Sequence, residues 1–312
     1  MKKQLQILSV LMLSAGFLFT SCKKERNDNP IDNNAELTIQ ADDQSRFINE
    51  SDAADDDANA ALENSNGSFL GENPVRPPLF LRCDATVTVD TTGSNRIITL
   101  TYNGDTCIGG RRTRSGSVVI RFSPSFRWSQ AGANYTVTYN NLRVTRLSDN
   151  KSIVINGSKT ITNVSGGRLR NLASSGPIVH TVISEGMTVT FDNGSQRSWR
   201  VARRRTFTYD NGMVISVTGI SPLGNGIETW GINRFGTEFR NAILEPMVIR
   251  QSCDFRLVSG KTQHTTMLAT TTTTFGLDAN GNPVSSCPSG TFYFKAQWMG
   301  ANGNTVTVIR PY

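Results

Sequence analysis

The sequence has few of the residues from which metal and catalytic sites are usually built. It contains two histidines and five cysteines in 312 residues. His180 and His264 stand alone in segments with a strand pattern, and no two cysteines have the Cys-x-x-Cys spacing of a zinc site. We therefore expect both histidines to be structural, and we predict no metal and no cofactor.

Motifs of nucleotide-binding and serine-hydrolase enzymes are also missing. The string nearest to Gly-x-Ser-x-Gly, residues 219–224, has the wrong spacing and is typical of a loop. The glycine-rich stretches lie beside strand patterns with no helix after them, which excludes a phosphate-binding loop. A glycosidase pair of carboxylates is not excluded, because the spacing of such a pair is spatial. The candidates are Glu228, Glu238 and Glu245.

The long hydrophobic run in the chain lies at its N-terminus. Lys2 and Lys3 precede a mostly apolar stretch from Leu5 to Leu18, which is the layout of a secretory signal. The stretch is too short for a comfortable membrane span. It ends Leu18-Phe19-Thr20-Ser21-Cys22, with a small residue directly before a cysteine. This ending resembles the lipobox of bacterial lipoproteins, with Phe19 where Leu is usual.

The resemblance implies that residues 1–21 are a signal peptide that is removed and that Cys22 carries the lipid. Several acyl chains would make the attachment to a membrane effectively permanent. The string Ser-Cys-Lys-Lys and the Asn- and Asp-rich sequence after it resemble uncharacterised outer-membrane and surface lipoproteins of the Bacteroidota. In enterobacterial lipoproteins an Asp directly after the lipidated cysteine is a retention signal for the inner membrane. No Asp follows Cys22, so the resemblance implies attachment to the outer membrane, with the domain facing the periplasm or the cell surface.

Charge is divided unevenly along the mature chain. Residues 23–72 contain 13 acidic and 4 basic residues, whereas residues 73–312 contain 12 acidic and 26 basic residues. The acidic segment is poor in large apolar side chains, a composition typical of disorder. We predict that residues 22–75 form a lipidated tether, mostly disordered, with a short helix over 52–63. Residues 76–312 would form the folded domain.

The basic domain indicates attraction to an anionic surface, such as an acidic envelope glycan or lipopolysaccharide. The acidic segment of the same chain would be an equally suitable partner, and a solvated strand surface is a third interpretation. We do not expect nucleic acid as a partner, because the basic residues are scattered among strands. The densest runs supply the candidate anion-binding residues: Arg111, Arg112, Arg114, Arg203, Arg204 and Arg205.

From Arg82 onward the sequence predicts antiparallel strands. Short runs rich in Val, Ile, Thr, Tyr and Phe alternate with clusters of Gly, Asn, Asp and Ser, and no segment has a sustained helical period. Asn-Gly pairs at 193–194 and 211–212 suit tight type I′ hairpins. The fold class is therefore all-β, a meander or a sandwich of hairpins. We expect a non-enzymatic binding or structural domain, with a carbohydrate-active or other hydrolytic enzyme as the alternative.

Four cysteines remain once Cys22 is assigned to lipid. Of the three possible connectivities we favour the local one, Cys83 with Cys107 and Cys253 with Cys287, in an oxidising compartment. The two pairs have similar sequence surroundings. An internal duplication relating residues 80–170 to 250–312 would explain the similarity, and chance is the alternative. Oligomeric state cannot be read from the sequence.

Overall fold

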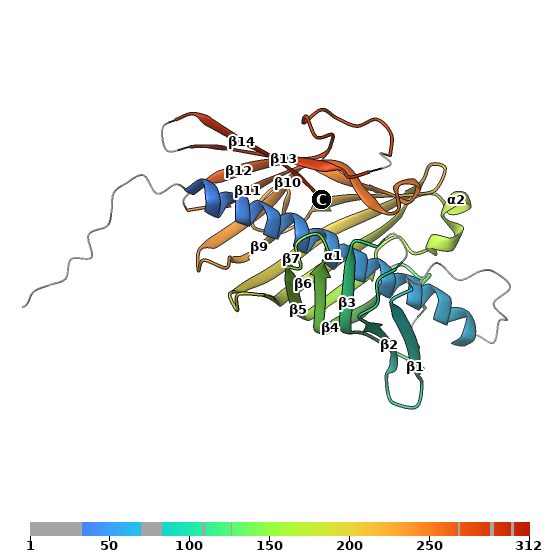
Figure 1. The fold of residues 1–312 in the computed structure, drawn as a ribbon. Coiled ribbons are helices and arrows are strands. Elements are labelled where there is room, and N and C mark those ends of the chain that lie inside the picture. The colour runs from blue at the N-terminus through green and yellow to red at the C-terminus, as the bar shows by residue number, and fades with distance from the viewer. Residues whose placement is uncertain are drawn as a thin grey trace, which may run out of the picture. The chain divides into compact units, whose positions relative to one another are not determined.

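The computed structural model describes residues 33–69, 83–107, 110–125, 127–267, 269–287, 290–300 and 303–312 (Figure 1). By its internal contacts the chain divides into two units, Met1–Asp32 and Asn33–Tyr312, and all the described residues belong to the second unit. The signal peptide and Cys22, which were predicted from the sequence, lie outside the described part of the chain.

One antiparallel sheet makes up most of the second unit. The neighbouring strands run in the order β1-β2-β3-β4-β5-β6-β7-β8-β10-β11-β12-β13-β14, and β9 pairs with both β7 and β10. The strands are β1 (Ala85–Asp90), β2 (Arg96–Asn103), β3 (Arg112–Phe122), β4 (Ala133–Arg146), β5 (Ser152–Asn163), β6 (Ile178–Phe191), β7 (Gln196–Tyr209), β8 (Met213–Gly219), β9 (Ile227–Ile232), β10 (Glu238–Arg250), β11 (Arg256–Thr266), β12 (Thr270–Leu277), β13 (Tyr293–Met299) and β14 (Thr305–Pro311).

The predicted all-β, antiparallel class is confirmed, and of the two predicted arrangements the structure has the meander. Consecutive strands pair along almost the whole sheet, so short turns suffice and no crossover helix is needed. The helical pieces after residue 82 are short: a 3₁₀ turn at Leu169–Asn171, α2 at Leu172–Ser175 and a 3₁₀ turn at Gln251–Cys253. The Asn-Gly turn at 211–212 has positive φ at both residues, whereas in the turn at 193–194 only Gly194 does.

A long helix, α1 (Asn33–Phe69), crosses one face of this sheet (Figure 1). The sequence predicted a helix over 52–63 inside a disordered tether, so the observed helix begins 19 residues earlier and ends 6 residues later. Its middle is deeply buried, with Ser51, Ala54, Ala58 and Leu62 at 0% exposure. The segment that looked too polar to fold is thus a central element of the unit, because the sheet supplies the partners that its charges need.

Helix α1 joins two hydrophobic clusters of the sheet. Phe47 and residues of its C-terminal half, such as Ala54 and Leu62, pack into a cluster built mainly from β2 to β7. Its N-terminal part, with Leu37 and Ile48, packs into a second cluster built mainly from β7 to β14. We call the face of the sheet against which α1 packs the inner face. The apolar side chains of β13, Phe294, Ala296 and Trp298, lie in the second cluster.

Two disulfides, Cys83–Cys107 and Cys253–Cys287, have the predicted local connectivity. Each closes a loop that contains one hairpin, β1-β2 in the first case and β11-β12 in the second. This shared arrangement agrees with the similar sequence surroundings of the two pairs, and the duplication itself stays a prediction.

Candidate binding face

The inner face of the sheet carries basic side chains that pair with the acidic side chains of α1. Helix α1 contains nine acidic residues and one basic residue. Seven of its carboxylates form ion pairs with strand or loop residues among the described side chains. The pairs are Asp42–Arg146, Asp43–Arg234, Glu50–Arg112, Asp52–Arg203, Asp55–Lys159, Asp56–Arg205 and Asp57–Arg114.

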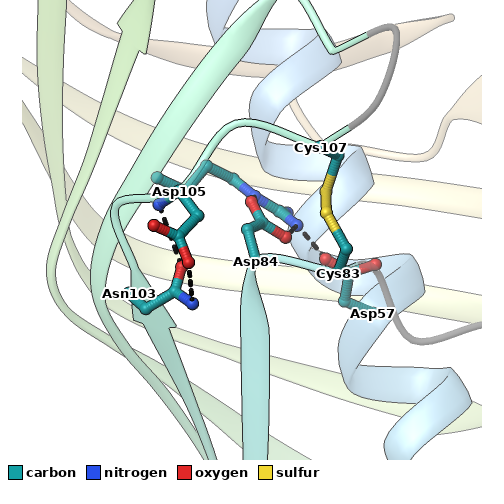
Figure 2. The surroundings of a disulfide bond; sticks show 7 residues. Asp57, Cys83, Asp84, Asn103, Asp105 and Cys107 are labelled. Carbon is teal, nitrogen blue, oxygen red and sulfur yellow. Dashed lines mark hydrogen bonds and ion pairs between the residues drawn. A yellow bond between two sulfur atoms is a disulfide. The ribbon is translucent and has the colours of Figure 1, made fainter.

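Arg114 is at the centre of one cluster, and its partners Asp57 and Asp84 lie beside the first disulfide (Figure 2). Its Nε and Nη2 donate to the two carboxylate oxygens of Asp84, each over 2.7 Å, and its Nη1 donates to Asp57 over 2.6 Å. Tyr102 donates to the same Asp57 oxygen, and the guanidinium lies 4.2 Å from the centre of its ring. Because Asp84 directly follows Cys83, the disulfide, three strands and the helix are tied together at this point.

Electrostatics around Arg114 follow from this geometry. Burial alone would raise the pKa of Asp84, but the hydrogen bonds and charge of Arg114 hold it below its usual value. The pKa of Tyr102 is raised well above its usual value by burial and by the charge of Asp57. Asp84 therefore stays ionised and Tyr102 stays neutral, which suits a structural cluster.

A second cluster surrounds Arg203, which is 1% exposed. Its Nη1 lies 2.7 Å from Asp52 and its Nε lies 2.5 Å from Glu228. Asn241 donates to the other oxygen of Glu228 over 2.6 Å. Burial raises the pKa of Glu228, although Arg203 opposes this. The two carboxylates that pair with Arg203 are thus enclosed between the helix and the sheet.

Lys159 forms the third cluster and is fully buried on β5. Its Nζ lies 2.9 Å from Asp55 and also donates to Ser51, and Tyr139 donates to Asp55. Burial lowers the pKa of Lys159, and the charge of Asp55 opposes that shift. Such a cation needs its partner, because an unpaired buried charge is far more costly than a paired one.

The six arginines predicted to bind an anion are not equivalent in the structure. Arg114, Arg203 and Arg205 are buried and paired with aspartates of α1, and half-buried Arg112 is paired with Glu50. Arg204 is exposed on the opposite face of β7. Arg111 is exposed and donates to Thr291 Oγ1 over 2.6 Å. Of the interpretations kept open from the sequence, pairing with the chain's own acidic segment is the one that these contacts support.

The three glutamates that were candidates for a carboxylate pair also differ in solvent exposure. Glu228 is 0% exposed, whereas Glu238 and Glu245 are exposed on β10. Glu245 pairs with Lys261, and Glu228 is occupied by Arg203 and Asn241. A sugar would have no access to Glu228 in this arrangement, so the geometry gives the glycosidase alternative no support.

Both histidines pack among aromatic rings. His180 lies 4.8 Å from Trp128 and 4.7 Å from Phe207, measured between ring centres, and His264 stacks on Phe239 at 5.3 Å. Burial, assisted by nearby arginines, lowers the pKa of each histidine to about 3. The described residues contain no group of three or more His, Cys, Asp or Glu side chains suited to a metal ion.

Two hollows can be described among the residues that the structure places. One, between α1 and strands β10 to β12, has a volume of about 10 Å³, is lined by His264 and Thr271 and has room for a single water. The other is an open groove of about 480 Å³ near the β3-β4 turn, lined by Arg121, Arg127 and mostly polar side chains. The sequence analysis singled out neither of these two arginines.

No protein-family model, no curated protein and no solved structure matches this chain. In the part of the chain that the structure describes, no helix is both long enough and apolar enough to cross a membrane. The functional argument therefore depends on the residues and contacts described above.

Proposed function

We propose that the protein is a lipid-anchored component of the cell envelope, held at the outer membrane by acyl chains on Cys22. The observation that carries this proposal is the pairing of the other four cysteines. Cys83–Cys107 and Cys253–Cys287 are both bonded, and such disulfides are typical of exported proteins. Cys22 is then the single cysteine left without a disulfide partner, and it is the one that ends the lipobox-like sequence.

The β domain is, on this proposal, a non-enzymatic binding or structural module. The support is that the buried basic residues of the inner face are engaged by α1, and that Glu228 is sealed between the helix and the sheet. Recognition of an anionic glycan or lipopolysaccharide would have to use cations outside the inner face, such as Arg204.

Mass spectrometry of protein purified from its native membrane tests the anchor. We expect a mature N-terminus at Cys22 with a diacylglyceryl group on sulfur and an acylated amine. A Cys22→Ser variant with the same signal sequence should leave the membrane fraction, while wild-type protein stays in it. An unmodified thiol at position 22, or a mature N-terminus elsewhere, would contradict the proposal.

A further inference from the structure

Exposed apolar side chains gather at one end of the sheet, at the tips of neighbouring hairpins. Met267 is 89% exposed, Met299 66%, Ile232 47% and Phe235 43%. Met267 lies in the β11-β12 turn, Met299 ends β13, and Ile232 and Phe235 lie at the β9-β10 turn. We call these residues, together with Ile39 of α1 (41% exposed), the apolar rim.

The strand register brings these hairpin tips to the same end of the sheet. Phe239, just after the β9-β10 turn, is opposite Thr266, just before Met267. Thr271, just after the β11-β12 turn, is opposite Trp298, just before Met299. The three turns therefore follow one another along one end of strands β9 to β14, as Figure 1 also shows.

The first turns of α1 lie against the same hairpins. Gln40 is hydrogen-bonded to His264, three residues before Met267, over 3.2 Å. Asp43 accepts from Arg234, directly before Phe235, over 2.5 Å. Helix α1 therefore enters the unit at the apolar rim, and its opposite end lies beside the first disulfide.

The length of chain before α1 limits how far this end can lie from the lipid. Cys22 precedes Asn33 by eleven residues, and at 3.3 to 3.6 Å per residue this stretch spans at most about 40 Å. The end of the unit nearest to the lipidated residue along the chain thus exposes Met267, Met299 and Phe235 to solvent, while the exposed aromatic residues Tyr209 and Phe255 lie toward the other end of the sheet. Contiguous exposed apolar side chains of this kind mark contact surfaces.

We infer that the apolar rim is a membrane-docking surface, which inserts into the interface of the same bilayer that holds the lipid on Cys22. This inference rests on the proposed anchor and adds the orientation of the domain to it. The hairpin tips provide side chains that enter the headgroup and acyl boundary, and exposed Arg240 at the start of β10 is placed to meet lipid phosphates.

Site-specific fluorescence in vesicles tests this orientation. Met267→Cys and Met299→Cys are each labelled with an environment-sensitive dye in the full, acylated chain, which is reconstituted into phosphatidylcholine vesicles with or without brominated acyl chains. Tyr209→Cys is the matched control, because Tyr209 is 57% exposed and ends β7 far from its β9-paired residues. We expect brominated lipid to reduce the emission at 267 and 299 by about twofold and to leave emission at 209 unchanged.

The outcomes distinguish a failure of the docking inference from a failure of the proposed lipid anchor. Protein that floats with the vesicles but shows no quenching at 267 and 299, or equal quenching at 209, overturns the docking inference and leaves the anchor intact. If the dye at 267 is blue-shifted but brominated lipid does not quench it, protein and not lipid covers the apolar rim. That result also overturns the docking inference. Protein that fails to float and lacks the acyl mass on Cys22 instead contradicts the proposed function.

Discussion

At the scale of single residues, the inner face depends on buried charges that meet their partners across the helix–sheet interface. Paired and hydrogen-bonded buried charges contribute little net stability, but removal of one partner is costly because the other stays buried and unpaired. The sequence contains an indication of these buried charges, because they occupy the same alternating positions of a strand as the buried apolar residues. Lys159 shares the alternation of Ile153, Ile155 and Ile161, and Arg203 shares that of Trp199.

Lys159→Met should therefore destabilise the fold strongly. The substitution keeps the volume but leaves the carboxylate of Asp55 without its cation, so we expect the free energy of unfolding to fall by about 3–5 kcal/mol. Urea denaturation with the disulfides intact measures this. Lys261→Met is the matched control, because its pair with Glu245 is solvent-accessible and should contribute less than about 1 kcal/mol. Equal effects at both positions would contradict the argument.

His180 should make the protein sensitive to acid. Its pKa is lowered to about 3 by burial, from a usual value of 6.5, so the unfolded chain takes up the proton first as the pH falls. The stability is therefore fully present above pH 6.5 and is lost progressively toward pH 3. His180→Phe should reduce this loss by on the order of a few kcal/mol while keeping the aromatic packing. Unfolding curves at several pH values would show it, and parallel curves for both proteins would contradict it.

Asp43 should act in the opposite direction. Burial raises its pKa from 3.8 to about 6, even though Arg234 opposes the shift. The folded state holds this proton more tightly, so the contribution is present below pH 3.8 and is lost as the pH rises through 6. Asp43→Asn should remove that dependence, so the difference in unfolding free energy between variant and wild type should change between about pH 4 and 6 and be constant below about pH 4. A constant difference over the whole range would contradict the shift.

At the scale of elements, α1 is a helix whose stability comes from the sheet. It carries a large excess of negative charge, and Asp52, Asp55 and Asp56 repel one another at helical spacing. In proteins most of the stability of a helix comes from tertiary packing rather than from its intrinsic propensity. A helix over 52–63 was predicted from the sequence, but the ion-pair partners of the observed helix lie 57 or more residues away along the chain.

A synthetic peptide of residues 33–69 should therefore be mostly unfolded at pH 7. We expect weak circular dichroism at 222 nm, which should increase below about pH 4 as the carboxylates become protonated and the repulsion ends. The full-length protein provides the comparison, since its α1 amides should be protected from hydrogen exchange at pH 7. A strongly helical peptide at neutral pH would show that local propensity, not the sheet, determines this element.

At the scale of the whole molecule, one continuous sheet and one helix share a core that two disulfides reinforce. The bonds close loops with sequence separations of 24 and 34 residues. Each should stabilise the fold by about 3–4 kcal/mol through the entropy of the unfolded chain. The pairing was predicted from the sequence as the connectivity that joins cysteines close along the chain, and in the structure each pair encloses a single hairpin.

Loss of either bond should lower stability without changing the fold. We expect the double variant Cys253→Ala with Cys287→Ala to unfold at a lower urea concentration, with a loss of about 3–4 kcal/mol and an unchanged near-ultraviolet spectrum. A reducing agent should have the same effect on wild-type protein at this bond. A variant as stable as the wild type would show that the disulfide does not stabilise the fold by lowering the conformational entropy of the unfolded chain.

The sequence by itself determined the all-β class, the hairpin turns and the disulfide pairs. These features depend on residues that are close along the chain, such as the alternation in β7 or the Asn-Gly turn after Tyr209. Only the tertiary structure decided that the acidic segment is a buried helix and that Arg114, Arg203 and Arg205 form ion pairs with it. A carboxylate is stable in a core only beside a cation, and the chain brings the two together only when the sheet has formed.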